Sequence, residues 1–159
     1  MVRKGFVLFL GLVLAFALYS LLGNLEPSLV ILVNAFSIVV FFAAVVYGEV
    51  EGAIMGTVAG LLQDAFSHSV FGLAGLSLTI SGFLAGWLSQ KLNLNTFYKR
   101  AVFIFFFSLV QLIIWVMFYF LIFRKSLLYS QPAIYLQPIF TAIITSSIIG
   151  LFRKLNKTA

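Results

Sequence analysis

The polar residues best suited to catalysis lie together near the middle of the chain. Asp64 and His68 are four residues apart, and Ser67 and Ser69 flank the histidine. On a helix, a spacing of four places two side chains on one face. A Ser-His-Asp triad could use these residue types, with the histidine taking the serine proton. Triad members normally converge from separate elements of a fold, so we regard hydrolase chemistry as a minor alternative and predict no catalytic residue.

Other kinds of catalytic or metal site lack the residues they need. The chain has one histidine and no cysteine, which argues against a structural or catalytic zinc site. Asp64 is the only aspartate, so the paired acids of an intramembrane aspartyl protease are missing. The glycines do not form a phosphate-binding loop, because they recur within apolar segments rather than in a turn after a strand. We therefore predict a protein that is not an enzyme and that has no cofactor and no metal ion.

The composition is that of an integral membrane protein. Hydrophobic residues make up 63% of the 159 residues and charged residues only 9%, which excludes an ordinary soluble domain. We predict a single membrane domain over 1–159. The formal net charge of +6 indicates membrane orientation rather than nucleic-acid binding, because the basic residues cluster at the ends of apolar segments. The lipid bilayer is thus the expected surroundings, and nucleic acid is not an expected partner.

Six apolar segments predict an all-α, polytopic bundle of six transmembrane helices. The first follows Arg3 and Lys4, as in a signal peptide, with Ala15 and Ala17 as a small-x-small site. Because the apolar run continues through this site, we expect an uncleaved helix. Pro138 predicts a kink in the last segment or a helix that begins there. The predicted spans are approximately 5–22, 29–47, 50–66, 72–90, 101–123 and 133–152.

The distribution of basic residues predicts that both termini are cytoplasmic. With an inner N-terminus, the inner regions hold eight of the ten lysines and arginines, and the outer loops hold only Arg124 and Lys125. This asymmetry follows the positive-inside rule and agrees with an even number of spans. Glu49 and Glu51 would then lie at the inner end of the third helix, where the helix dipole favours an acid.

A stripe of small residues dominates the third and fourth segments. Glycines recur every four residues and the same step ends on Asp64, so all of them share one helical face. Small residues allow two helices to approach closely. We predict a tight helical hairpin, with packing inside the bundle favoured over partner binding. The helix-packing or partner-binding candidates are Gly48, Gly52, Gly56, Gly60, Asp64, Gly72, Gly75, Gly82 and Gly86.

The hairpin resembles the rod shape-determining MreD family. The resemblance rests on Gly56-x-x-x-Gly60-Leu-Leu-x-Asp64, followed eight residues later by Gly72. It implies a fold similar to the substrate-binding subunits of energy-coupling-factor transporters, in the bacterial cytoplasmic (inner) membrane. It also implies a scaffold of the cell-elongation machinery that binds MreC and helps couple MreB filaments to peptidoglycan synthesis. RodA and a class B penicillin-binding protein would belong to the same assembly.

An uptake transporter offers an alternative function on the same fold. The chain would then be its small-molecule (vitamin-type) binding subunit. Such a subunit needs a cavity lined by several polar residues near the outer face, for which the candidates are Asp64, His68, Asn34 and Gln111. It also needs a surface for a membrane coupling protein, and the small pair Gly11 and Ala15 is a weak candidate for that contact.

Overall fold

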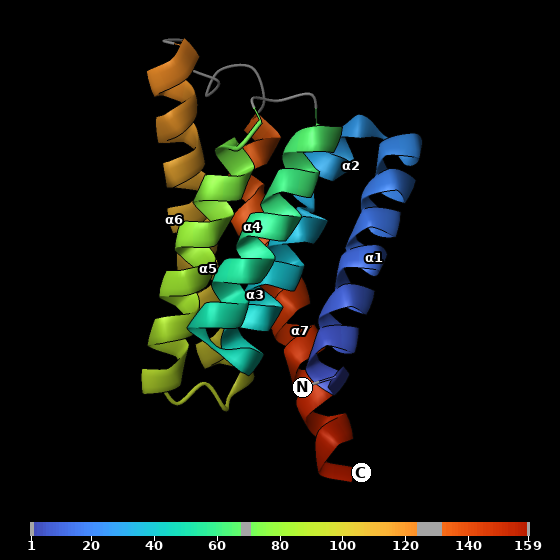
Figure 1. Cartoon of the computed structure of the whole chain (residues 1–159), viewed down its shortest axis with the longest axis vertical. Helices are drawn as coiled ribbons and strands as arrows, with labels where there is room; N and C mark the ends of the chain where they lie inside the picture. Colours follow the sequence, from blue (N-terminus) through green and yellow to red (C-terminus); the bar gives the residue numbers. More distant parts are fainter. Residues whose placement is uncertain (1, 68–70, 124–131, 159) are drawn as a thin grey trace.

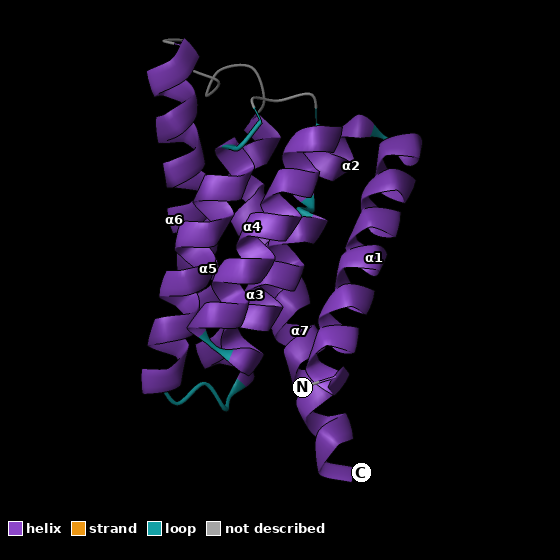
Figure 2. Ribbon diagram, in the orientation of Figure 1, coloured by secondary structure: helices purple, strands orange, loops and turns teal. Residues whose placement is uncertain are grey.

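The computed structural model describes residues 2–67, 71–123 and 132–158. Regular secondary structure within these ranges is entirely helical (Figure 2), which confirms the predicted all-α class. The elements in chain order are α1 (Val2–Leu25), α2 (Pro27–Leu32), α3 (Ala35–Tyr47), α4 (Glu49–Phe66), α5 (Leu73–Lys91), α6 (Phe97–Phe123), the 3-10 helix η2 (Pro132–Leu136) and α7 (Gln137–Thr158).

The helices form an elongated bundle, with α4 and α5 side by side and α1 at one edge (Figure 1). Both chain termini lie at the same end of the bundle, which we call the terminal end; we call the opposite end the distal end. Three described helices are long and apolar enough to cross a membrane, within Lys4–Leu25, Phe97–Ile122 and Ile134–Leu155. The helix Ala35–Tyr47 is apolar but shorter.

The predicted single helix over 29–47 is wrong, because two helices occupy this segment. Pro27 begins α2 immediately after Glu26, where its missing N–H costs no helical hydrogen bond. The chain then leaves helical geometry at Val33 and Asn34, and the Asn34 side chain accepts a hydrogen bond from the Ser37 N–H at 3.0 Å. Asparagine is a favoured N-cap residue. The one strongly polar residue of this segment therefore starts a new helix inside the bundle.

The last two helices also differ from their predicted limits. Helix α6 begins at Phe97 rather than at 101, so Lys99 and Arg100 belong to its first turn. Pro138 lies in the first turn of α7, directly after η2, so a helix begins there rather than bending. Since the first N–H groups of a helix have no partner within it, proline is tolerated at that position.

Helix α3 is the centre of the bundle. Its residues from Ala35 to Val45 are all buried, and it contributes to both apolar core clusters. Helix α1 is the opposite case, because most of its side chains are exposed. Large exposed apolar residues such as Phe6, Phe9 and Leu14 fit contact with lipid, where no water penalises an apolar surface.

Candidate functional site

Helices α4 and α5 touch backbone to backbone along their length. A Cβ atom added to Gly52 would lie 2.5 Å from the carbonyl oxygen of Gly82, and one on Gly60 would lie 2.5 Å from the Gly75 Cα. One on Gly86 would lie 2.5 Å from the Glu49 Cα. No side chain fits at these positions. The small-residue faces of α4 and α5 are therefore occupied by each other.

Two further glycines permit the chain reversals at either end of this hairpin. Gly48 joins α3 to α4 with φ +110°, and Gly72 precedes α5 with φ +99°. Residues with a Cβ rarely adopt these values. The turn residues 68–70 lie outside the described residues, and so does the predicted His68–Ser69 part of the chemical cluster.

Asp64 caps α5 from the end of α4. Its side chain is only 2% exposed. One carboxylate oxygen accepts the N–H groups of Gly72 (2.9 Å) and Gly75 (3.1 Å), and the other accepts that of Ala74 (3.0 Å). Two of these N–H groups lie in the first turn of α5 and the third belongs to its N-cap residue, Gly72, which has no side chain to cap the helix. This geometry gives Asp64 a structural role.

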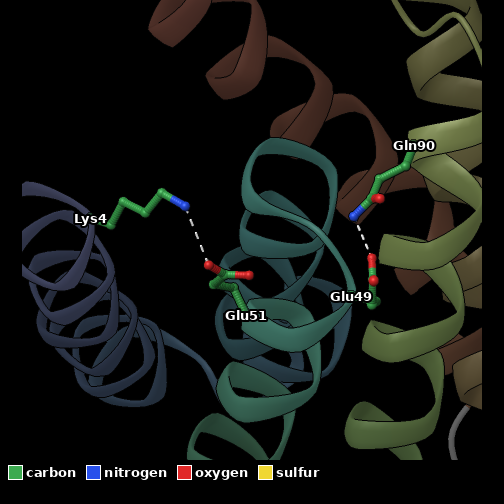
Figure 3. A network of polar contacts seen from close by, with 4 residues as sticks. All are labelled: Lys4, Glu49, Glu51 and Gln90. Carbon is green, nitrogen blue, oxygen red and sulfur yellow. Dashed lines mark hydrogen bonds and ion pairs between the residues drawn. The ribbon is translucent and has the colours of Figure 1, made fainter. Parts of the chain in front are cut away.

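Polar contacts at the terminal end tie α1 and α5 to α4 (Figure 3). The Lys4 Nζ lies 3.4 Å from Glu51 Oε1, and the Gln90 amide donates to the Glu49 carboxylate. Both acids lie in the first turn of α4, as predicted from the helix dipole. Because Lys4 and Gln90 are exposed, each contact contributes at most about 1 kcal/mol to stability. These contacts join the ends of α1, α4 and α5, which is a structural role.

The predicted docking pair on α1 faces the interior. Ala15 is buried in the cluster that includes Phe36 and Val39 of α3, and a Cβ on Gly11 would lie 3.4 Å from a methyl group of Val39. The small residues bring α1 close to α3. The pair is therefore not on the surface of α1 that a coupling protein could reach.

A second set of polar residues lies inside the bundle on α3, α6 and α7. Ser37 Oγ donates to Gln111 Oε1 at 3.4 Å, which joins α3 to α6. Helix α7 contacts both α3 and α6 and contributes polar residues at steps of four, which share one helical face. We call the set the polar core. Its buried members are Asn34, Ser37, Ser108, Gln111, Gln137, Thr141 and Thr145.

Three hydroxyl groups of the polar core are unsatisfied. Ser108, Thr141 and Thr145 are each at most 1% exposed, and their oxygens find no hydrogen-bond partner among the described residues. A buried hydroxyl without a partner costs about 1–3 kcal/mol. The interior of an apolar bundle therefore carries hydroxyl groups that no described residue satisfies.

The polar core extends toward the distal end. Helices α6 and α7 run in opposite directions (Figure 1), and Ser146 Oγ donates to the Phe97 carbonyl at the start of α6. Gln137 and Thr141 precede Ser146 on α7, and Ser108 and Gln111 follow Phe97 on α6. Both pairs therefore lie further from the terminal end. Asn34, at the start of α3, approaches the same region through Ser37 and Gln111.

Sequence reasoning identified Asn34 and Gln111 but missed the other members of the polar core. A usable signal was present in α7, where Gln137, Thr141 and Thr145 recur every four residues in an apolar segment. The members are amides and alcohols without charge. Within the described ranges no three histidine, cysteine or acidic residues gather as they would for a metal ion. The chemistry of this region suits hydrogen bonding to a neutral organic molecule.

Comparison with known proteins identifies a matching family. The sequence model of a family described as "ECF-type riboflavin transporter, S component" matches residues 7–153. No curated protein and no solved structure matches the chain. The matched range covers all helices except the outermost residues of α1 and α7.

This match corrects the functional prediction drawn from the hairpin. The chain does not belong to the MreD family, and the predicted role in cell shape and elongation is wrong. The expected partners MreC, RodA and a class B penicillin-binding protein are withdrawn with it. The matched family supports an integral, multi-pass membrane protein that acts as a transporter subunit rather than as an enzyme.

Proposed function

Because this chain belongs to the family of S components of ECF-type riboflavin transporters, we propose that it is the vitamin-binding subunit of an uptake transporter, with riboflavin as its substrate. The observation that carries the proposal is the polar core, in which three buried hydroxyls have no hydrogen-bond partner among the described residues. A binding subunit must offer hydrogen bonds that the ligand completes, and such groups are concentrated there.

The chemistry of the polar core suits riboflavin. The vitamin is uncharged, with a flat ring whose edge carries carbonyl and N–H groups and with a ribityl chain that carries hydroxyls. Amide side chains such as Gln111 and Gln137 can donate to and accept from a ring edge, and threonine hydroxyls can pair with a polyol. Because the core contains no charge, a neutral vitamin fits it better than a phosphorylated one, whose anionic group would be buried unpaired.

The position of the polar core agrees with uptake from outside. We propose a protein of the bacterial cytoplasmic membrane with six crossings, formed by α1, by α2 and α3 together, and by α4, α5, α6 and α7. The excess of basic residues at the terminal end supports cytoplasmic termini. The distal members of the polar core, Asn34, Gln111 and Gln137 among them, then lie toward the outer side, where α2 and η2 contact each other.

Riboflavin should bind the purified chain, and Thr141→Val should weaken that binding by about tenfold or more. Valine matches threonine in shape but removes one hydroxyl, which is worth about 1–3 kcal/mol when the ligand completes its hydrogen bond. Titration followed by quenching of riboflavin fluorescence gives the affinity. Thermal unfolding without ligand should be unchanged or raised, since this hydroxyl has no described partner in the free protein.

Thr57→Val is the matched control for the riboflavin titration. The Thr57 hydroxyl lies on the exposed side of α4 and bonds to Ala53 and Thr79, so its loss should leave riboflavin affinity within about twofold. Absence of riboflavin binding by the wild-type chain would overturn the proposed substrate. Equal affinities of wild type and Thr141→Val would remove Thr141 from the site.

Isolation of the tagged chain in mild detergent should recover an ATPase and a membrane coupling subunit. The two proteins correspond to the A and T components that an S component serves, and mass spectrometry would identify them. A tagged membrane protein of similar size from the same cells is the control. Recovery of MreC or penicillin-binding proteins instead, with no ATPase, would contradict the proposed function.

A further inference from the structure

A buried arginine lies at the start of α6. Arg100 is 6% exposed although it belongs to the first turn of the helix. Its Nε is buried and has no hydrogen-bond partner in the part of the chain that the structure describes. The guanidinium lies against α7 at Gly150, where an added Cβ would be 3.0 Å from Nη2. Glycine at position 150 thus leaves the room that the Arg100 side chain occupies.

A second arginine lies beside the first. Arg153 is one turn beyond Gly150 on α7, and its Nη1 donates to the Leu94 carbonyl (3.0 Å) and to Asn95 Oδ1 (3.4 Å). Both acceptors are uncharged. Since Gly150 touches the Arg100 guanidinium and Arg153 follows one turn later on α7, the two positive charges share one region of the bundle. Arg153 therefore ties the α5–α6 connection to α7. As a second cation, it cannot balance the positive charge of Arg100.

No described carboxylate neutralises this pair. Glu51 forms an ion pair with Lys4, and Glu49 accepts from Gln90. Asp64 lies at the distal end of α4, where it caps α5. Burying a cation without a counter-charge is strongly unfavourable. A buried Arg100 with the half-buried Arg153 on the neighbouring helix calls for an anion from outside the chain.

We propose that Arg100 and Arg153 form a binding site for a phosphate group between α6 and α7, filled by an anionic phospholipid headgroup or by free phosphate. Guanidinium groups bind phosphate oxygens through paired N–H donors. The site lies at the end of two membrane-spanning helices, which is the level of lipid headgroups, and basic pockets between such helices bind anionic headgroups. The inference does not depend on riboflavin being the substrate.

The test measures phosphate binding by the full-length chain in neutral detergent and phosphate-free buffer. Native mass spectrometry would follow titration with phosphatidylglycerol, phosphatidylcholine and inorganic phosphate. The variants are Arg100→Gln and Arg153→Gln. The control is Lys99→Gln, an exposed neighbour with the same change of charge. Each arginine variant should bind the phosphate-bearing ligand at least about tenfold more weakly, and Lys99→Gln should stay within about twofold of wild type.

The choice of ligands separates the two sources of phosphate. Preferential retention of phosphatidylglycerol over phosphatidylcholine, without saturation by millimolar inorganic phosphate, would assign the site to a lipid. Saturation by inorganic phosphate without lipid preference would assign it to the free ion. If Arg100→Gln fails to fold, Arg153→Gln carries the test, because Arg153 is only half-buried.

Two results would overturn the phosphate site. One is that the arginine variants bind phosphatidylglycerol and inorganic phosphate with unchanged affinity. The other is a loss of other transporter subunits on purification with no change in phosphate binding, because the arginines would then face an acidic side chain of a partner protein.

Discussion

Replacing Gly60 with leucine should abolish accumulation of the folded protein in the membrane. The added side chain would start 2.5 Å from the Gly75 Cα and 2.6 Å from the Ala74 carbonyl oxygen. Both obstacles are backbone atoms, so no rotamer relieves the clash, and α4 would have to move away from α5. Overpacking by a few methylene groups already costs about 1–3 kcal/mol in a well-packed core, and a leucine at a backbone contact should exceed that range.

Two other glycine substitutions isolate this effect. Gly5→Leu adds the same side chain where nothing lies within 4 Å and should leave the yield unchanged. Gly75→Ala adds one methyl group 3.3 Å from the Leu61 Cδ2, a flexible end, and should cost less than Gly60→Ala. Membrane yield and fluorescence-detected size-exclusion profiles would measure all four variants. A wild-type profile for Gly60→Leu would contradict the described packing of α4 on α5.

Asp64→Ala should lower the unfolding free energy by about 3–5 kcal/mol. The substitution removes the charged acceptor of three backbone N–H groups and leaves those groups buried without an obvious replacement. Asp64→Asn keeps one carbonyl oxygen and should give an intermediate loss. Thermal unfolding in detergent, or unfolding in a mixed detergent–SDS series, would measure both.

The matched control for Asp64→Asn is Glu26→Gln, which neutralises an exposed carboxylate at the distal end. It should change the unfolding free energy by less than about 0.5 kcal/mol. A residue that only caps a helix does not contact the substrate. Riboflavin affinity per folded molecule should be retained in Asp64→Asn. Normal stability together with lost riboflavin binding would instead make Asp64 a ligand-binding residue.

The mistaken resemblance to MreD has a structural explanation. It rested on Gly56, Gly60, Asp64 and Gly72, which the structure uses for helix contact and for capping the next helix. Such a pattern specifies a close hairpin with a capped turn, and any membrane bundle that needs this hairpin can carry it. The motif therefore indicated a fold rather than an activity, and function depends on residues elsewhere on that fold.

The helical class, the membrane setting and the close hairpin could be predicted from the sequence alone. Each depends on local periodicity, because a step of four residues places glycines on one face whatever the rest of the chain does. The division of 29–47 into α2 and α3 was missed although the sequence contains signals for it. Pro27 and Asn34 are both residues that favour the start of a helix. The nearly continuous apolar composition of 29–47 led to the prediction of a single span.

The polar core and the arginine pair were decided by tertiary structure. Asn34, Gln111 and Thr141 belong to three helices, and Arg100 meets Gly150 across α6 and α7. No spacing along the chain encodes which faces of separate helices meet, because that depends on how the side chains of the whole bundle pack together. The sequence by itself determined the helical class and the glycine contact face, and the packing of the helices decided which polar groups come together in the interior.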